Sequence, residues 1–292
     1  MDEQDVLARR FEAHRGHLRA VAYRMLGSLS EADDAVQEAW LKLSRSDTSD
    51  VANLGGWLTT VVGRVCLDML RSRTARREEA LDVHLPDPII TTADTVNPEH
   101  EALLADSVGL ALLVVLESLN PAERLAFVLH DMFAVPFDEI GPILGRSPAA
   151  AKQMASRARR RVQGTAPTPD PDPARQREVV EAFLAAARAG DFDALVAVLD
   201  PDVVARSDGG SLRPSAVVRG ARTVAGRALL SAKLAQVAHP ALVNGAAGIV
   251  ATAHGELVSV LAFTIANGKV VEIDIYTDPD RLRRLNLAHL GR

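Results

Sequence analysis

The chain has 292 residues and a net charge of −5, so it is long enough for about two domains and is not, taken whole, a binder of polyanions. Its single cysteine, Cys66, excludes an internal disulfide and any cysteine-rich zinc site, and we expect neither a metal nor a cofactor. The acidic N-terminus lacks the apolar stretch of a signal peptide, and no run of about 18 apolar residues is present. We therefore expect a cytoplasmic protein that does not enter the membrane.

Residues 5–45 show the apolar spacing of helices, with a break at Gly27. In the second helix Val36, Ala39 and Leu43 recur at steps of three or four, which predicts a buried stripe. The opposite face is polar and carries Asp33, Asp34, Gln37 and Glu38. From the pattern alone, such a face is more typical of a solvated surface than of a binding patch.

A polar, aperiodic loop at 44–53 precedes a basic helix. Residues 57–77 hold five arginines and one aspartate, a local net charge of +4. Leu58 and Val65 lie on one side, and the polar residues on the other side are Thr60, Arg64, Asp68 and Arg71. An apolar back and a basic front suit a helix that contacts nucleic-acid phosphates, but an ordinary solvated helix has the same pattern. Both interpretations stay open.

Prolines at 86, 88 and 98 predict a linker after this helix, and helical spacing resumes near Glu101. Residues 137–162 then predict two short helices joined by a tight turn. Gly145 supplies the left-handed backbone in which helices often end, and Ser147 followed by Pro148 is a preferred helix start. The sequence therefore predicts a helix-turn-helix.

The second helix of this pair, with its turn, carries six positive charges and no acid. A helix-turn-helix lays such a helix in the major groove of DNA. Long basic side chains bind phosphates there, and polar ones near the helix start, such as Lys152 and Gln153, reach base edges. A solvated basic face is the alternative, but the agreement of turn, caps and charge favours DNA binding.

Four prolines between residues 164 and 173 mark the clearest boundary in the chain. Beyond it we predict helices at 174–190, 192–199 and 221–234, and strands at 203–206, 217–219, from 241 towards 253, at 256–266 and at 269–277. The pair Asn267-Gly268 between the last two strands is the preferred two-residue hairpin turn. The predicted fold class is two all-α parts, the second with the helix-turn-helix, followed by an α+β domain whose curved sheet wraps against helices.

Three segments in this order, EADDAVQEAWLKL, WLTTVVGRVCLDMLRSR and LNPAERLAFVLHDMFAVPFDEIGPILGRSPAAAKQMASRARRR, resemble a bacterial extracytoplasmic-function (ECF) sigma factor over residues 5–163. The remainder resembles a SnoaL-like, cone-shaped domain. The resemblance implies sigma domain 2 at 1–78, an interdomain linker at 79–100, sigma domain 4 at 101–163, a proline-rich linker at 164–173, a SnoaL-like domain at 174–277 and a tail at 278–292.

Such a factor would bind RNA polymerase core and promoter DNA and direct promoter-specific initiation. The resemblance implies that the clamp helices of the β′ subunit are bound by Asp33, Asp34, Gln37, Glu38 and Leu41. The minus-ten element would face Trp57, Thr60, Arg64, Asp68, Arg71 and Arg73, with loop 44–53 close to a flipped base. The minus-thirty-five element would be read by Arg146, Ser147, Ala149, Lys152, Gln153, Ser156, Arg157 and Arg160.

In sigma factors with this appendage, the SnoaL-like domain regulates activity in cis by contacting the sigma domains. Three short signatures are implied, and here they read HLPDP at 84–88, DGGS at 208–211 and DPDRL at 278–282. A linker that contains proline is stiff and offers a preformed surface for docking. The implied contact residues are Leu85, Pro86, Asp87, Pro88, Asp208, Gly209, Gly210, Asp278, Pro279, Asp280, Arg281 and Leu282.

SnoaL-type domains are often enzymes that hold a carboxylate in an apolar pocket. Strict alternation along the last strand puts Val270, Glu272, Asp274 and Tyr276 on one face. Asp274 and Tyr276 are therefore candidate pocket residues, with His254 or Asp208 as a further member. We favour a non-catalytic domain, because no nucleophile, metal set or cofactor loop accompanies them. An isomerase-like enzyme or a small-molecule sensor fused to a DNA-binding module is the alternative. A plain repressor leaves the first helical part without a role.

Overall fold

A computed structural model describes residues 3–46, 51, 53–76, 85–91, 109–165, 167–209 and 215–285 of the chain. These residues form two compact units. The helical unit holds residues 3–76 and 112–165, and the C-terminal unit holds residues 85–91, 109–111 and 167–285, in each case where described. Among the helices described, none is long and apolar enough to cross a membrane.

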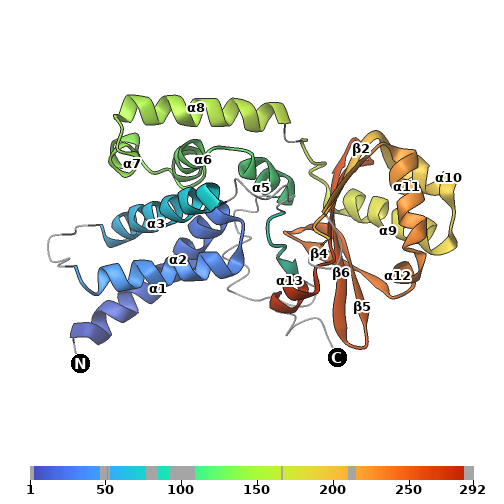
Figure 1. Cartoon of the computed structure of the whole chain (residues 1–292), viewed down its shortest axis with the longest axis horizontal. Helices are drawn as coiled ribbons and strands as arrows, with labels where there is room; N and C mark the ends of the chain where they lie inside the picture. The colour runs from blue at the N-terminus through green and yellow to red at the C-terminus, as the bar shows by residue number, and fades with distance from the viewer. Residues whose placement is uncertain are drawn as a thin grey trace. The chain divides into compact units, whose positions relative to one another are not determined.

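Three long helices build the first half of the helical unit (Figure 1): α1 (Glu3–Leu26), α2 (Leu29–Leu43) and α3 (Leu54–Arg76). Gly27 ends α1 with a φ of +69°, and the Ser28 side chain accepts a hydrogen bond from the amide of Glu31 at the start of α2. Leu18, Met25 and Leu58 are fully buried between these helices.

The second half contains α5 (Leu110–Glu117), α6 (Pro121–Phe127), the short π-helix η2 (Val128–Met132), α7 (Phe137–Leu144) and α8 (Pro148–Thr165). The predicted helix-turn-helix is confirmed in α7 and α8. Gly145 has a φ of +63° at the end of α7, and the Ser147 hydroxyl accepts a hydrogen bond from the amide of Ala150 at 3.3 Å.

The C-terminal unit is built on one seven-stranded sheet in the order β1-β4-β5-β6-β7-β2-β3. The strands are β1 (Ile90–Thr91), β2 (Leu199–Ser207), β3 (Ala216–Arg219), β4 (Ala238–Val243), β5 (Ala246–Ala253), β6 (Glu256–Ala266) and β7 (Lys269–Tyr276). Neighbours are antiparallel except β2 and β7, which run parallel. The two helical parts followed by a sheet with helices confirm the predicted fold class.

The segment predicted to run from 241 towards 253 is two strands, so that prediction is wrong in its continuity. Asn244 and Gly245 have φ values of +50° and +77° and turn the chain back between β4 and β5. They form the same kind of turn as Asn267 and Gly268, whose φ values are +53° and +71°. The sequence therefore holds two Asn-Gly turn signals, and each marks a hairpin between two strands.

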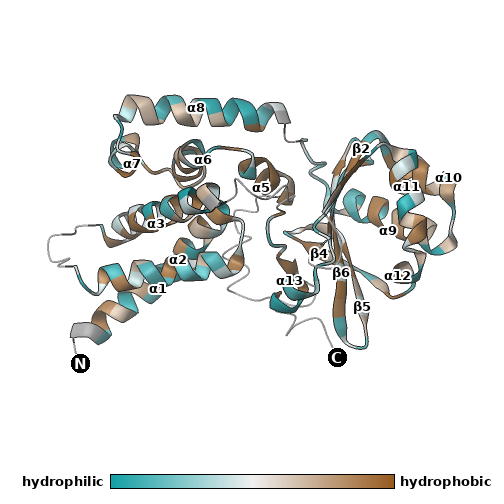
Figure 2. Ribbon diagram, viewed as in Figure 1, coloured by the Kyte–Doolittle hydropathy of each residue, from teal (hydrophilic) through white to brown (hydrophobic). Residues whose placement is uncertain are grey.

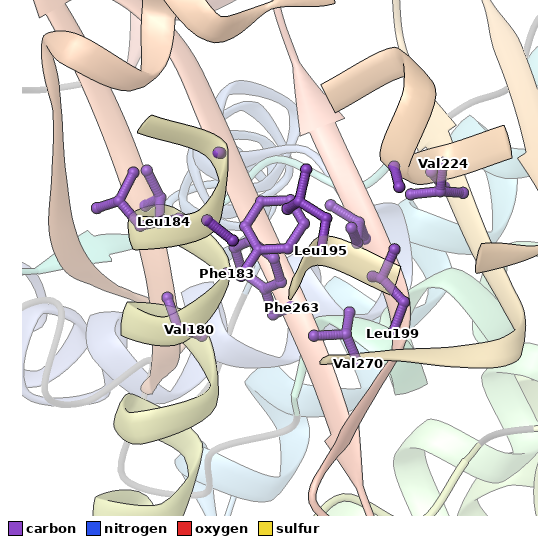
Figure 3. Packing of buried hydrophobic residues seen from close by; sticks show 14 of the residues in the cluster. Val180, Phe183, Leu184, Leu195, Leu199, Val224, Phe263 and Val270 are labelled. Carbon is purple, nitrogen blue, oxygen red and sulfur yellow. The ribbon is translucent and has the colours of Figure 1, made fainter. Parts of the chain in front are cut away.

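The helices α9 (Pro173–Ala189), α10 (Phe192–Val198), α11 (Ala221–Leu230) and α12 (Ala232–Gln236) lie on one side of the sheet, and α13 (Pro279–Arg284) lies on the other (Figure 1). Figure 2 shows the strands as largely hydrophobic ribbons. In the core between sheet and helices, Phe183 of α9 meets Phe263 of β6 with ring centroids 5.2 Å apart (Figure 3).

Part of the predicted interdomain linker belongs to the sheet of the C-terminal unit. Ile90 pairs with Val243, so β1 lies beside β4. The Asn244 side chain accepts a hydrogen bond from the amide of Ile89 at 3.0 Å, and the Asn244 amide donates to Ile89 O at 2.8 Å. Leu85 and Ile89 are buried, at 0% and 2% exposure. These apolar residues, next to stiff prolines, make an edge strand out of a stretch that reads as irregular. The rest of the predicted linker, at 79–84 and 92–100, lies outside the described residues, as do residues 77–78 and 101–108.

Candidate nucleic-acid interface and linker contacts

The basic helix α8 rests on a buried stripe of small residues. Ala151, Ala155 and Ala158 have no exposed surface. In the turn before α8 the backbone passes so close to α7 that a Cβ added to Gly141 would lie 2.8 Å from the backbone oxygen of Arg146. Small residues at these positions let α8 pack tightly through one narrow face, and the remaining faces stay open to solvent.

The exposed face of α8 and its turn carries all eight residues that the sequence singled out here: Arg146, Ser147, Ala149, Lys152, Gln153, Ser156, Arg157 and Arg160. Figure 2 shows α8 as a largely hydrophilic ribbon. Nothing in the packing of the helical unit buries these side chains. Together they form a polar surface with small residues near the start of the helix and arginines along its length.

Charge on this face is unevenly neutralised. Arg157 donates to the Glu123 carboxylate at 2.8 Å, and Arg159 forms an ion pair with Asp131. Arg161 lies 3.7 Å from the same Glu123. Within the part of the chain that the structure describes, Arg146, Lys152 and Arg160 make no ion pair. An external anion could therefore pair with these three cations without displacing an internal partner.

A small hollow lies beside the start of α3. Its lining consists of Lys42, Trp57, Thr60, Val61 and Arg64. Trp57 and Thr60 are half-buried, Arg64 is exposed, and the Thr60 hydroxyl donates to Trp57 O at 2.7 Å. Lys42 comes from the end of α2 and was not among the predicted site residues. No periodicity within α3 could have found it, because only tertiary packing brings it to this hollow.

Further along α3, the predicted DNA-facing residues divide into two groups. Asp68 and Arg71 are exposed and lie 3.8 Å apart. Arg73 is different: its guanidinium donates to Leu26 O at 3.2 Å, forms an ion pair with Glu31, and lies 3.9 Å from Glu117. Its side chain is only 15% exposed. The placement of Arg73 in the DNA-facing set is therefore corrected: it holds α3 against neighbouring elements of the helical unit.

The acidic face of α2 is exposed along its whole length. Asp34 and Gln37 face solvent, Asp33 receives two hydrogen bonds from Arg19 at 2.7 and 3.1 Å, and Glu38 lies 3.0 Å from Lys42. Leu41 continues this face and is 38% exposed, which is unusual for a large apolar side chain in the described structure. The exposed face of α2 is therefore polar over most of its length and ends in one exposed apolar side chain.

In the C-terminal unit, Arg281 joins the linker to the sheet. Its guanidinium donates to the Asp87 carboxylate at 2.8 Å and to Leu85 O, and it lies 3.5 Å from Asp208. The same guanidinium stands 4.9 Å from the centre of the Tyr276 ring, whose hydroxyl donates to Pro86 O at 2.8 Å. We call Leu85, Asp87, Asp208, Tyr276 and Arg281 the Arg281 cluster. It brings together residues from all three predicted signatures.

Asp208 anchors the side of this cluster that belongs to the sheet. Its carboxylate accepts hydrogen bonds from the amides of Thr277 at 2.9 Å and Asp278 at 3.3 Å. Gly209 follows with a φ of +60°, and Gly210 lies outside the described residues.

The other signature residues are placed as follows. Asp278 caps α13 by accepting from the Asp280 amide at 3.0 Å, Pro279 and Asp280 are exposed, and Pro88 and Leu282 are buried.

The structure does not gather His254, Asp274 and Tyr276 in a pocket, so that prediction is corrected. His254 is exposed in the turn between β5 and β6, with a φ of +54°. Asp274 is held by Arg206 at 3.1 Å, and Tyr276 is engaged with the linker. The cavity of the C-terminal unit is lined by other residues, among them Ile273 and Ile275. Those side chains alternate along β7 with Asp274 and Tyr276, which point away from the cavity.

Alternation along β7 also fails at one point. Thr264 pairs with Glu272 and Ile265 with Val270, so Val271 is an extra residue in β7. This bulge puts Val270 into the same core as Ile273, whereas strict alternation assigned it to the face of Asp274. Burial raises the pKa of Asp274 to about 6; Arg206 acts to lower the pKa and Glu272 to raise it. Asp274 is therefore a buried partner of Arg206, not an acid or base facing a substrate site.

This chain is similar to known sigma factors, both in its family-model matches and in its relatives. A family model described as Sigma-70 region 2 matches residues 10–76, and one described as Sigma-70, region 4 matches residues 109–162. ECF RNA polymerase sigma factor SigJ of Mycobacterium tuberculosis is 42% identical over 290 residues, covering 93% of this chain and 91% of the relative. The probable ECF sigma factor SigI of the same species is 36% identical over 297 residues, covering 100% of this chain and 99% of the relative.

A crystal structure of Mycobacterium tuberculosis SigJ is similar to this structure, with a TM-score of 0.76 and 39% sequence identity. The match covers 96% of this chain and 100% of the SigJ chain. The similarity therefore extends through both the helical unit and the C-terminal unit.

Proposed function

The chain belongs to the extracytoplasmic-function family of RNA polymerase sigma factors, and from this premise we propose how its surfaces share the work of directing promoter-specific transcription initiation. A sigma factor binds RNA polymerase core and promoter DNA and is not itself an enzyme. In our proposal α2 binds the polymerase, α3 binds the minus-ten element, and α8 binds the minus-thirty-five element. The C-terminal unit acts on the linker between the sigma domains.

For the polymerase contact we propose the exposed face of α2, with Asp34, Gln37 and Leu41 at its centre and the β′ clamp helices as its target. The free carboxylate of Asp34 supports this, as does the exposed apolar Leu41 at the end of the same face. Asp33 and Glu38 contribute less in this proposal, because each already has an internal cation.

For the minus-ten element we propose the start of α3 and the adjoining hollow. An aromatic ring, a hydroxyl and two cations around one hollow suit a single unstacked base and its phosphates. Trp57 would stack on the base, and Lys42 and Arg64 would contact the backbone. The loop predicted to lie close to the flipped base has residues 47–50 and 52 outside the described part of the chain. We leave Arg73 out of this surface.

For the minus-thirty-five element we propose the exposed face of α8. The observation that supports this best is the combination of a buried stripe of three alanines with three cations that lack an ion pair among the described residues. The helix can approach DNA with Ala149 at its start, Gln153 and Ser156 facing the bases, and Lys152 and Arg160 on phosphates. Arg157 would have to give up its bond to Glu123 to contribute.

For regulation in cis we propose that the C-terminal unit controls the linker between the sigma domains through the Arg281 cluster. The linker contributes a strand and buried side chains to this unit, and one arginine of the tail holds its backbone and Asp87. A linker held in this way cannot adopt freely the path that two promoter elements require. Release of the cluster would therefore change initiation without touching either DNA-facing helix.

Run-off transcription with purified core polymerase tests these assignments together. Full-length protein should support promoter-dependent initiation, and Gln37→Arg should abolish it while leaving the fold intact by circular dichroism. Arg281→Met should change the initiation rate several-fold, whereas Arg283→Met, which removes an exposed arginine from the same helix, should not. Equal rates for wild type and both arginine variants would refute regulation through the cluster, and retained activity of Gln37→Arg would refute the α2 assignment.

A further inference from the structure

The C-terminal unit has a cavity of about 520 Å³, partly open to solvent, between the sheet and the helices α9, α11 and α12. This volume lies within the range of roughly 300–1,000 Å³ that is usual for small-molecule sites. The walls are mainly apolar and include Leu184, Val224, Leu261, Ile273 and Ile275. Leu184 of α9 and Val224 of α11 stand on either side of the core in Figure 3.

Of the polar residues that line this cavity, Ser259 is the most buried. Ser259 of β6 lines the cavity although the residue is only 2% exposed. No hydrogen bond of its hydroxyl is found among the residues described. The hydroxyl of this nearly buried residue can therefore pair with a hydrogen-bonding group of a molecule inside the cavity.

The exposed part of the lining combines apolar side chains with Arg227. The other arginine of the lining, Arg206, is paired with Glu272 and Asp274. Leu230, at the end of α11, is 88% exposed, and Leu234 of α12 is 39% exposed, although both line the cavity. Arg227 stands one turn before Leu230, is exposed, and has no ion pair within the described parts of the chain. Exposed apolar residues around a concave site mark a surface used for binding. The guanidinium beside them selects for negative charge.

We propose that this cavity binds an amphipathic small molecule, an apolar chain or ring that carries one anionic group. The apolar part fills the space between the sheet and α9, and the anion pairs with Arg227 at the mouth. The site differs from the pocket predicted around Asp274, since its lining lies on the other face of β7. Its expected ligands are long-chain carboxylates and related aromatic acids.

Occupancy of the cavity is coupled to the linker through neighbouring residues. Gly209 and Thr277 both line the cavity, and they flank Asp208 in space: one follows it in sequence, and the other donates its amide to the Asp208 carboxylate. A ligand that contacts Gly209 and Thr277 would therefore change the position or mobility of Asp208, which belongs to the Arg281 cluster. This coupling rests on the proposed regulation in cis, whereas binding itself does not.

Binding is tested on the full-length protein with three probes that share one chain: dodecanoate, dodecanol and dodecyltrimethylammonium, each used below its micellar concentration. Calorimetry should give one saturable site, with dodecanoate tightest and the cation weakest. Arg227→Gln should weaken dodecanoate about threefold, as expected for a single exposed charge, and leave dodecanol unchanged. Arg222→Gln, on the same helix but outside the cavity lining, is the matched control and should bind like wild type.

Two variants fill the cavity from opposite walls: Ala228→Phe from α11 and Ser259→Leu from β6. Each should reduce dodecanoate binding at least tenfold, and thermal unfolding identifies a variant that fails to fold. Saturable binding that is unchanged in both folded variants would overturn the proposal, as would the absence of saturable binding to wild type. If dodecanoate binds as described but does not alter run-off transcription, the cavity assignment stands and its coupling to the linker fails.

Discussion

Replacing Arg281 with methionine should release the linker strand from the C-terminal unit while keeping the apolar stem of the side chain. The guanidinium makes charge-assisted bonds to Asp87 and to Leu85 O, and its side chain is 13% exposed. Asp87 is 18% exposed, so solvent screens the pair only in part. Hydrogen bonds to charged groups contribute about 1.5–3 kcal/mol each. Allowing for that screening, we expect a loss of about 2–3 kcal/mol.

This loss corresponds to a roughly 30- to 150-fold increase in the fraction of time that the linker is detached. Hydrogen exchange followed by mass spectrometry of the peptide around residues 85–91 measures it directly, because the amide of Ile89 is protected by Asn244. Exchange of the β5–β6 hairpin in the same sample should stay at the wild-type rate, which separates local release from global unfolding.

Arg283→Met is the control for this measurement, since the Arg283 side chain is 68% exposed and, among the described residues, its ion pair is with Asp280 in the same helix. A double-mutant cycle with Asp87→Asn should then return a coupling of about 1–2 kcal/mol between Arg281 and Asp87. If the 85–91 peptide exchanges at the same rate in wild type and in folded Arg281→Met, Arg281 does not hold the linker and the reasoning is refuted.

Three further predictions concern packing, charge and pH. Gly141→Ala should destabilise the helical unit by about 1–3 kcal/mol, because the added Cβ would meet the backbone of Arg146. Gly164→Ala in α8 is the control: its Cβ would have open space around it, so the change should be neutral or stabilising by up to about 1 kcal/mol. Thermal unfolding of the two variants measures the difference. Arg160→Gln should lower the salt dependence of binding to minus-thirty-five DNA by about one phosphate contact. Arg159 is already paired with Asp131, so Arg159→Gln should lower the salt dependence less. Equal slopes of affinity against salt concentration in the two variants would contradict the assignment of unpaired cations. The pKa of Asp274, raised from 3.8 to about 6, means that the native chain holds this proton more tightly than the unfolded chain, so its contribution to stability is full below pH 3.8 and is lost as the pH rises through about 6. Asp274→Asn should remove about 3 kcal/mol of that pH dependence in urea unfolding, and a constant difference between the two proteins across this range would count against it.

Sequence reasoning located the recognition helix well because its signals are local. Gly145, Ser147 and Pro148 each fix a backbone conformation or a cap within a few residues, and apolar spacing then assigns the exposed face. The same holds for the hairpin at Asn267 and Gly268. The Asn244-Gly245 turn carried an equally local signal, and reading one strand through it was an error of interpretation rather than a lack of information.

Charge pattern alone could not separate an arginine that faces DNA from one that holds the fold. Arg64, Arg71 and Arg73 look alike on a helical wheel, but only Arg73 meets acids brought to it by α2 and α5. Lys42 was missed for the converse reason, since its neighbours in the hollow come from a different helix. Whether a cation such as Arg73 or Lys42 packs within the protein or faces DNA thus depends on neighbours that are distant in sequence.

The sequence by itself determined most of the helices and strands, the helix-turn-helix, the family and the three stretches that meet in the Arg281 cluster, because each rests on residues close together in the chain. Only the tertiary structure decided that the linker joins the sheet as β1, that a bulge moves Val270 into the core, and that Asp274 faces away from the cavity. The physical reason is that strand pairing and burial depend on contacts between segments far apart in sequence. The energy of such a contact is therefore gained only when both segments are in place in the folded unit.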